Sequence, residues 1–278
     1  MSEHVKVTER TEVMTVTLNR PDKLNAVNRE MTEVLRDAIW SFGDRQDLRV
    51  LIITGVGRYF TAGLDISAAA MEDRLNAEGA SRTRIDIRRK YRARYHTLFD
   101  ELEIIEKPVI LAAQGPCLGV GVELAVSCDF RFCTPEALFG LPEIRIGGIA
   151  SSGGISRLTR LVGPAWSKWI NLAGKSIDAQ TALMIGLVHE VYPTAEFVDR
   201  VESFARDLIN LPEEQLGLAK LAIDAVKAED REKGRHIERL AFSALQGLPG
   251  TELRLPPRAE PRINHEVTVD PPPGSADF

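Results

Sequence analysis

The stretch VILAAQGPCLGVGVELAVSCDFRFC, residues 109–133, decides the fold class. It opens with an apolar run at 109–113, which is typical of a strand buried on both faces in a parallel sheet. A glycine-rich turn follows, and a helix is expected to begin at 121–127. Residues 129–133 are typical of another strand. Strand, turn, helix and strand in this order predict an α/β domain.

The same alternation occurs nearer the N-terminus. A β-branched run at 13–18 predicts a strand, and residues with apolar side chains at helical spacing follow it. Asn25 or Asn28 is the expected N-cap of that helix. An apolar run at 50–55 ends in glycine and predicts a second buried strand. The first unit of the chain is therefore expected to be β-α-β.

The second half of the chain is mostly helical in pattern. Gly163-Pro164 fits the end of one element and the start of a helix. Further helices are expected there at 197–211, 213–227 and 231–246, and one is expected earlier in the chain, at 82–105. Seven prolines follow Gly247, so an extended tail without a core of its own is expected there. The predicted division is an α/β core (1–195), a helical region (196–250) and a Pro-rich tail (251–278).

The composition is that of an ordinary globular protein. The 278 residues are 44% hydrophobic and 27% charged, which allows a sizeable core. A net charge of −5 argues against nucleic acid as the main partner. Three cysteines without paired spacing argue against a disulfide framework and a zinc site. The sequence has no leader-like segment and no apolar run that would span a bilayer, so a cytoplasmic protein without membrane contact is expected.

Several familiar ligand-binding motifs are incomplete. Two Gly-x-Gly segments begin a dinucleotide fingerprint, but Leu124 and Phe60 stand where it requires its third glycine. Trp169 replaces the first glycine of a P-loop, and Ala150 replaces the first glycine of a nucleophile elbow. The five histidines lack the spacing of metal ligands. We therefore expect no metal, no nicotinamide cofactor and no nucleoside triphosphate.

Two glycine-containing segments, 59–65 and 119–121, place backbone amides where an anion can approach. The second segment precedes a helix, and a helix N-terminus directs unpaired N–H groups at a ligand. Two such amides on one oxygen form an oxyanion hole. Tight turns between strand and helix are the alternative interpretation of each segment.

Two glutamates lie close to these segments in the sequence. Glu123 sits among glycine and apolar residues, and Glu143 follows twenty residues later. Carboxylates in apolar surroundings usually have a partner or a chemical task. The alternatives are a catalytic pair and a structural pair bonded to backbone or to an arginine such as Arg145.

A set of short segments has a recognisable order along the chain. They are 20–26 (RPDKLNA), 60–66 (FTAGLDI), 119–125 (GVGVELA), 128–129 (CD), 139–143 (FGLPE), 153–158 (GGISRL), 177–180 (IDAQ) and 186–188 (GLV). Over residues 8–245 the ordered set resembles the crotonase superfamily, the enoyl-CoA hydratase/isomerase family. The Pro-rich tail is not part of that pattern.

The resemblance implies a spiral of β-β-α units, followed by C-terminal helices that mediate a homotrimer or a dimer of trimers. It also implies an acyl-CoA substrate and no cofactor other than the coenzyme A of that substrate. The thioester oxygen would be held by the backbone N–H groups of Leu64 and Val120. CoA-binding residues would be Lys23, Leu24, Ala62, Leu64, Asp65, Ile66 and Gly119. The sequence also has an arginine-rich run at 82–94. This run either attracts the CoA phosphates or forms a solvated helix face.

Glutamates at both positions resemble the hydratases of the family. The prediction is an enoyl-CoA hydratase, a lyase of fatty acid metabolism, in which Glu143 protonates C2 and Glu123 activates water. Val120 stands where the family usually has glycine or alanine, and Ala150-Ser151 where hydratases commonly have Pro-Gly. Double-bond isomerisation, hydration coupled to carbon–carbon cleavage and a catalytically idle binding member are therefore the alternatives.

Overall fold

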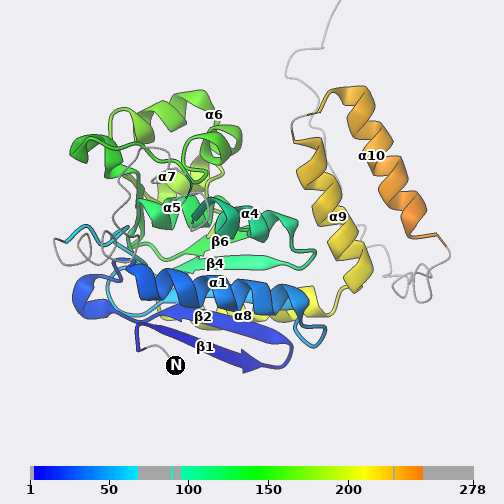
Figure 1. The fold of residues 1–278 in the computed structure, drawn as a ribbon, viewed down its shortest axis with the longest axis horizontal. Helices are drawn as coiled ribbons and strands as arrows, with labels where there is room; N and C mark the ends of the chain where they lie inside the picture. Colours follow the sequence, from blue (N-terminus) through cyan, green and yellow to red (C-terminus); the bar gives the residue numbers. More distant parts are fainter. Residues whose placement is uncertain (1–2, 68–88, 90–94, 228, 247–278) are drawn as a thin grey trace, which may run out of the picture.

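The computed structural model describes residues 3–67, 89, 95–227 and 229–246. Within them, two sheets and a set of packed helices form an α/β fold (Figure 1). The larger sheet contains, in spatial order, β1 (Val5–Arg10), β2 (Val13–Leu18), β3 (Val50–Gly55), β4 (Val109–Ala113), β6 (Phe130–Cys133) and β9 (Glu190–Val191). The smaller sheet contains β5 (Cys117–Leu118), β7 (Leu138–Gly140) and β8 (Ile177–Asp178).

The central strands of the larger sheet are parallel and buried. β2 pairs with β3, β3 with β4 and β4 with β6, all in parallel. All five residues of β4 are buried, and so are the first four of β3. These near-continuous apolar runs are what a parallel strand covered on both faces requires. The predicted α/β class is confirmed.

The edge strand β1 was not predicted from the sequence. It pairs with β2 in the antiparallel direction, with Val5 opposite Leu18. Only Val5 is buried, and the other five residues are exposed. An edge strand facing water carries charged residues in place of an apolar run, so the sequence VKVTER gave little strand signal. The first unit is thus β-β-α followed by β3.

Helices cover both faces of the larger sheet (Figure 1). Those described in the first two thirds of the chain are α1 (Arg29–Asp44), α4 (Thr97–Ile104), α5 (Val120–Ala125), α6 (Ser156–Asn171) and α7 (Ala179–Met184), with 3-10 turns η1 (Pro21–Lys23) and η3 (Pro142–Ile146). α1, α4 and α5 share the main apolar core with the strands, including Phe42, Phe99 and Leu111. α8 (Phe197–Ile209) packs on the opposite face, where Val201 and Leu208 join a second cluster with Ile110.

Local signals explain the ends of several helices. Asn28 is the N-cap of α1, and its side chain accepts a hydrogen bond from the Met31 N–H at 2.9 Å. Of the two asparagines considered, Asn28 is therefore the cap. The expected break at Gly163-Pro164 is also present: Gly163 has φ 77° and ψ 164° inside α6. A helical segment from Ser156 precedes the break, which the sequence pattern did not predict.

The C-terminal helices α9 (Glu213–Val226) and α10 (Arg231–Ala244) lie beside the body of the fold (Figure 1). Lys220 fastens α9 to it, because its Nζ donates to the Leu102 and Lys107 carbonyls and to Asp129 Oδ2 at 2.8–3.0 Å. α10 packs against α9 and has no buried residue. Of the predicted helix at 82–105, residues 97–104 are α4, and most of the rest lies outside the described residues, as does the Pro-rich tail.

Candidate active site

The two glycine-containing segments lie side by side. The segment around Ala62 is paired with residues 24–27: the Ala62 N–H donates to the Leu24 carbonyl at 2.9 Å, and the Val27 N–H to the Gly63 carbonyl at 2.8 Å. The Leu118 N–H donates to the Thr61 carbonyl at 3.0 Å. Three stretches that are distant in sequence therefore meet at one place.

Gly63 and Gly119 lie close together where the two segments meet. Both have positive φ, +104° and +55°. A Cβ atom built on Gly119 would lie 3.4 Å from Gly63 Cα, so the two backbones lie close together, and the positive φ of both residues favours glycine. Glycine at these positions therefore brings the next residues, Leu64 and Val120, into proximity.

The N–H groups of Leu64 and Val120 are available for a ligand. Neither donates a hydrogen bond to a carbonyl in the part of the chain that the structure describes. Val120 is the first residue of α5, where helix geometry leaves N–H groups without an internal acceptor. Two free N–H groups on neighbouring backbones have the donor groups that an oxyanion hole requires.

Glu123 lies on the first turns of α5 and is 2% exposed. Its Oε1 accepts hydrogen bonds from the backbone N–H groups of Ser151, at 2.7 Å, and Ser152, at 2.6 Å. Burial raises the pKa of Glu123, and these amide hydrogen bonds oppose the rise. The carboxyl is thus held in place by backbone, in a setting that favours proton uptake.

Glu143 belongs to η3 and approaches the same place from another direction. Its Oε1 lies 2.9 Å from the position that a Cβ on Gly119 would occupy. Its Oε2 is buried and has no hydrogen-bond partner among the described residues. Burial raises the pKa of Glu143, and the charge of Glu123 raises it further. The two carboxyls are therefore near enough for the charge of Glu123 to act on Glu143.

The alternative interpretation of the glutamates as a structural pair with Arg145 does not fit this geometry. Arg145 Nε instead donates to the Gly174 carbonyl at 3.1 Å. The structural interpretation also named hydrogen bonds from backbone groups, and Glu123 does accept such bonds.

The side chain of Val120 faces an apolar space. It is 5% exposed and lines a cavity of about 10 Å³ together with Tyr95, Phe99 and Leu124. The side chain is therefore accommodated by packing between α5 and α4, while the N–H of Val120 remains unused by the described chain.

The predicted CoA-binding residues fall into two groups. Lys23 and Leu24 lie in and after η1, beside Ala62. Asp65 is buried, whereas Ile66 is 59% exposed on the same loop. Of the arginine-rich run, only Arg89 lies within the described residues.

The sequence motifs contain a buried ion pair that was not predicted. Arg20 Nη1 donates to Asp65 Oδ2 at 2.7 Å and to the Ala26 carbonyl at 3.0 Å. Burial acts to raise the pKa of Asp65, but hydrogen bonds from Arg20 and Ser67 outweigh it and lower the pKa to about 2. The pair ties the loop that carries Leu64 to the loop at 20–26. The sequence signal for this pair was an arginine in the motif at 20–26 and an aspartate in the motif at 60–66.

The described residues contain no group of three or more His, Cys, Asp or Glu side chains that could hold a metal ion. Among the helices in the described ranges, none is long and apolar enough to cross a membrane.

Comparison with known proteins places the chain in a family. The profile of the enoyl-CoA hydratase/isomerase family matches residues 8–248. The chain belongs to the enoyl-CoA hydratase/isomerase family. This confirms the crotonase superfamily and its fold as the sequence motifs predicted.

Relatives and solved structures cover most of the chain. It is 35% identical over 226 residues to the crotonyl-CoA hydratase of Syntrophomonas wolfei, covering 81% of this chain and 83% of the relative. It is 35% identical over 213 residues to the short-chain-enoyl-CoA hydratase of Clostridium acetobutylicum, covering 76% and 77%. The crystal structure of enoyl-CoA hydratase from Thermoplasma volcanium superposes with a TM-score of 0.79 at 31% identity, covering 90% and 95%.

Proposed function

We propose that this protein is an enoyl-CoA hydratase, a hydro-lyase that adds water to the double bond of a 2-trans-enoyl-CoA thioester. The observation that carries the proposal is that Glu143 approaches Gly119, next to the unused N–H groups of Leu64 and Val120. Glu123 is near enough to affect the pKa of Glu143. Relatives named as hydratases at 35% identity support the reaction class.

In the proposed reaction, the thioester oxygen accepts hydrogen bonds from the N–H groups of Leu64 and Val120. Water attacks C3 and gives a proton to the carboxylate of Glu123. The electron pair of the double bond moves toward the thioester, and the resulting enolate oxygen is stabilised by the two donors. Loss of one such donor typically costs about 3–4 kcal/mol of transition-state stabilisation.

The second proton comes from Glu143, whose pKa is raised by burial, which favours the protonated acid. As the enolate collapses, this proton moves to C2, which gives the 3-hydroxyacyl thioester. Glu123 then holds one proton and Glu143 has lost one, and transfer between the coupled carboxyls restores the starting state.

Double-bond isomerisation is the second candidate. Glu143 Oε2 has no partner among the described residues, so this carboxyl is free to move a proton between C2 and C4, whereas Glu123 Oε1 is engaged by two amides. Hydration coupled to carbon–carbon cleavage would begin with the same hydration step, so only its cleaved products distinguish it. A non-catalytic binding role has less support, because it requires neither carboxyl.

Assembly into a homotrimer or a dimer of trimers is part of the proposal. α10 has no buried residue, and its Leu240 and Phe242 are 64% and 66% exposed, which is the kind of apolar surface that another subunit covers. We also propose the division into a core (1–195) and a helical region (196–250), and a cytoplasmic location. CoA is expected along Lys23, Leu24, Ala62, Asp65, Ile66 and Gly119.

A panel of short, long and aromatic 2-enoyl-CoA esters tests the function. Hydration removes the absorbance of the conjugated thioester, and mass spectrometry of the product then shows a gain of one water. Hydration of at least one ester is expected. Shifted double bonds or cleaved products without any hydrated ester would replace the hydratase proposal with one of the alternatives.

A further inference from the structure

Arg157 lies on the first turn of α6, behind the loop that holds Glu123. Its N–H donates to the Gly153 carbonyl at 2.9 Å, and its Nη1 lies 3.4 Å from the Ser152 carbonyl. A Cβ on Gly153, which has φ +107°, would be 2.8 Å from Nη1 and 2.9 Å from Cδ. The side chain of Arg157 therefore occupies the space that a side chain at position 153 would fill.

The other side of the same loop packs against Glu123. The Ser151 and Ser152 N–H groups donate to its Oε1, and a Cβ on Gly154 would lie 3.2 Å from its Cγ. The loop is thus enclosed between a guanidinium on one side and a carboxyl on the other. A change in the position of Arg157 would be transmitted to the amides that hold Glu123.

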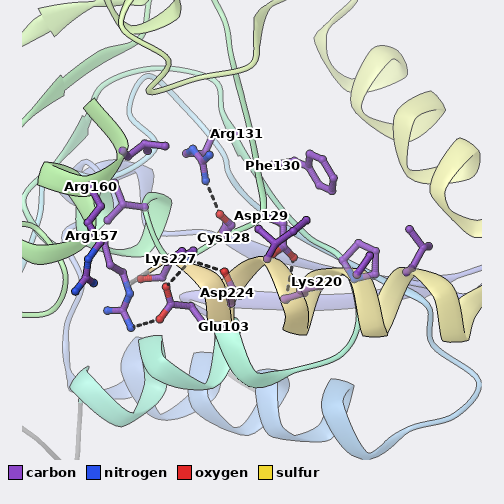
Figure 2. A pocket seen from close by; sticks show the side chains of 17 residues that line it. Glu103, Cys128, Asp129, Phe130, Arg131, Arg157, Arg160, Lys220, Asp224 and Lys227 are labelled. Carbon is purple, nitrogen blue, oxygen red and sulfur yellow. Dashed lines mark hydrogen bonds and ion pairs between the residues drawn. The ribbon is translucent and has the colours of Figure 1, made fainter. Parts of the chain in front are cut away.

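Arg157 is itself fixed by carboxylates from α4. Its Nη2 donates to Asp100 Oδ1 at 2.5 Å and to Glu103 Oε2 at 2.8 Å, and its side chain is only 13% exposed. Glu103 Oε1 in turn accepts a hydrogen bond from Lys227 at 3.3 Å. Lys227 is the C-cap of α9, so the chain of charges runs from the loop at Glu123 to a C-terminal helix (Figure 2).

A cavity of about 410 Å³ lies along this chain, between α9 and the body of the fold. Figure 2 shows Arg157, Glu103 and Lys227 on its wall, with Arg160 next to Arg157. The open space means that Lys227 can be replaced without a packing defect. Arg160 is exposed on the next turn of α6, which makes it a matched control for the loss of an arginine from the same wall.

We propose that Arg157 is the positioning residue for Glu123, and that the ion-pair chain from Arg157 through Glu103 to Lys227 makes the action of Glu123 depend on the docking of helix α9. The proposal rests on the proposed role of Glu123 as the base. Arg157 does not touch the substrate in it. The guanidinium holds the Ser152–Gly153 peptide so that both amides point at the carboxylate.

The expected readout is the ionisation of the base. Amides that donate to the carboxylate lower the pKa of Glu123, so amides that have moved away let it rise. Glu123 also faces His96 at the start of α4 and Glu143 from η3. These two residues stay unchanged in every comparison, so a difference between variants reports on Arg157.

The pH dependence of kcat/KM for a hydrated ester is compared between the wild type, Arg157→Met and Arg160→Met. Arg157→Met should lower kcat by about 10–100-fold, as expected for a misplaced catalytic group, and should move the acid limb of the profile to higher pH. Its KM should change by less than about threefold, since CoA contacts are elsewhere. Arg157→Lys keeps the positive charge, so its acid limb should lie between those of the wild type and Arg157→Met. Arg160→Met should have the wild-type pH profile.

Lys227→Met tests the far end of the chain, and it keeps the proposal testable if Arg157→Met does not fold. Its acid limb should move in the same direction by a smaller amount. Folded Arg157→Met and Lys227→Met enzymes with the wild-type profile would overturn the proposal, as would an equal shift in Arg160→Met. Glu123→Gln separates the two levels: if it keeps full activity, the proposed function fails, whereas an inactive Glu123→Gln with an unshifted Arg157→Met refutes only the positioning role.

Discussion

Gly119→Ala perturbs the proposed oxyanion hole and the proposed acid at once. Gly119 has φ +55° and ψ −123°, a conformation that residues with a Cβ rarely adopt, and such strain costs on the order of 1–3 kcal/mol. The new Cβ would also lie 2.9 Å from Glu143 Oε1, whereas ordinary contacts are at about 3.5 Å. Glu143 or the backbone at Val120 must therefore move by roughly half an ångström.

A shift of this size matters because misplacing a catalytic group by about 1 Å costs on the order of 100-fold in rate. We expect Gly119→Ala to lower kcat by about 10–100-fold and to lose on the order of 1–3 kcal/mol in unfolding free energy. Hydration of an enoyl-CoA and urea denaturation measure the two effects.

Gly147→Ala is the matched control. Gly147 has φ +79° at the end of η3, and no atom lies within 4 Å of the position of its Cβ. It should lose about 1–2 kcal/mol of stability from left-handed strain alone and keep its activity. Full activity in Gly119→Ala, or an equal loss of kcat in Gly147→Ala, would refute the reasoning.

Three further predictions concern stability. Burial raises the pKa of Glu123, so its ionised form destabilises the fold; Glu123→Gln should unfold at higher urea than the wild type at pH 8, and the gain should vanish near pH 3, where both states bind the proton. A gain that persists at pH 3 would contradict this. Arg20 helps to lower the pKa of Asp65 to about 2, so the stability that Asp65→Asn loses at pH 7 should shrink as pH falls from about 4 toward 2; a constant loss across that range would argue against the ion pair. Lys220→Met should cost up to about 3–5 kcal/mol because it leaves the partly buried Asp129, whose side chain is 20% exposed, without its cation; an unchanged denaturation midpoint would show that α9 is not held there.

Much of the fold could be predicted because its signals are local. Apolar runs marked the buried strands β3 and β4, and the helices α8, α9 and α10 end within two residues of their predicted bounds. Their apolar spacing and their flanking prolines and glycines lie within the segments themselves. β1 escaped prediction because its pairing with β2, and not its own side chains, makes it a strand.

The site could be predicted only in part. The motifs, with their unusual glycines, predicted Glu123, Glu143, Leu64 and Val120 as site residues, and the roles of these residues stay predictions. The amides of Ser151 and Ser152 that hold Glu123 were not, because a backbone donor leaves no trace in residue type.

The contacts of Arg157 were equally invisible in the sequence. They join Asp100, Glu103 and Ser152, which lie 57, 54 and 5 residues away. Charged residues at such separations pair only when the fold brings their helices together, so long-range structure was needed to find them.

The central claim is that Glu123 and Glu143 together add water across an enoyl-CoA double bond. The most direct test is the hydration rate of the preferred ester with the wild type, Glu123→Gln and Glu143→Gln, alongside calorimetric binding of a saturated acyl-CoA. Each variant should lose about 10²–10⁴-fold in kcat and still bind the acyl-CoA. Full hydration activity in either variant would contradict it.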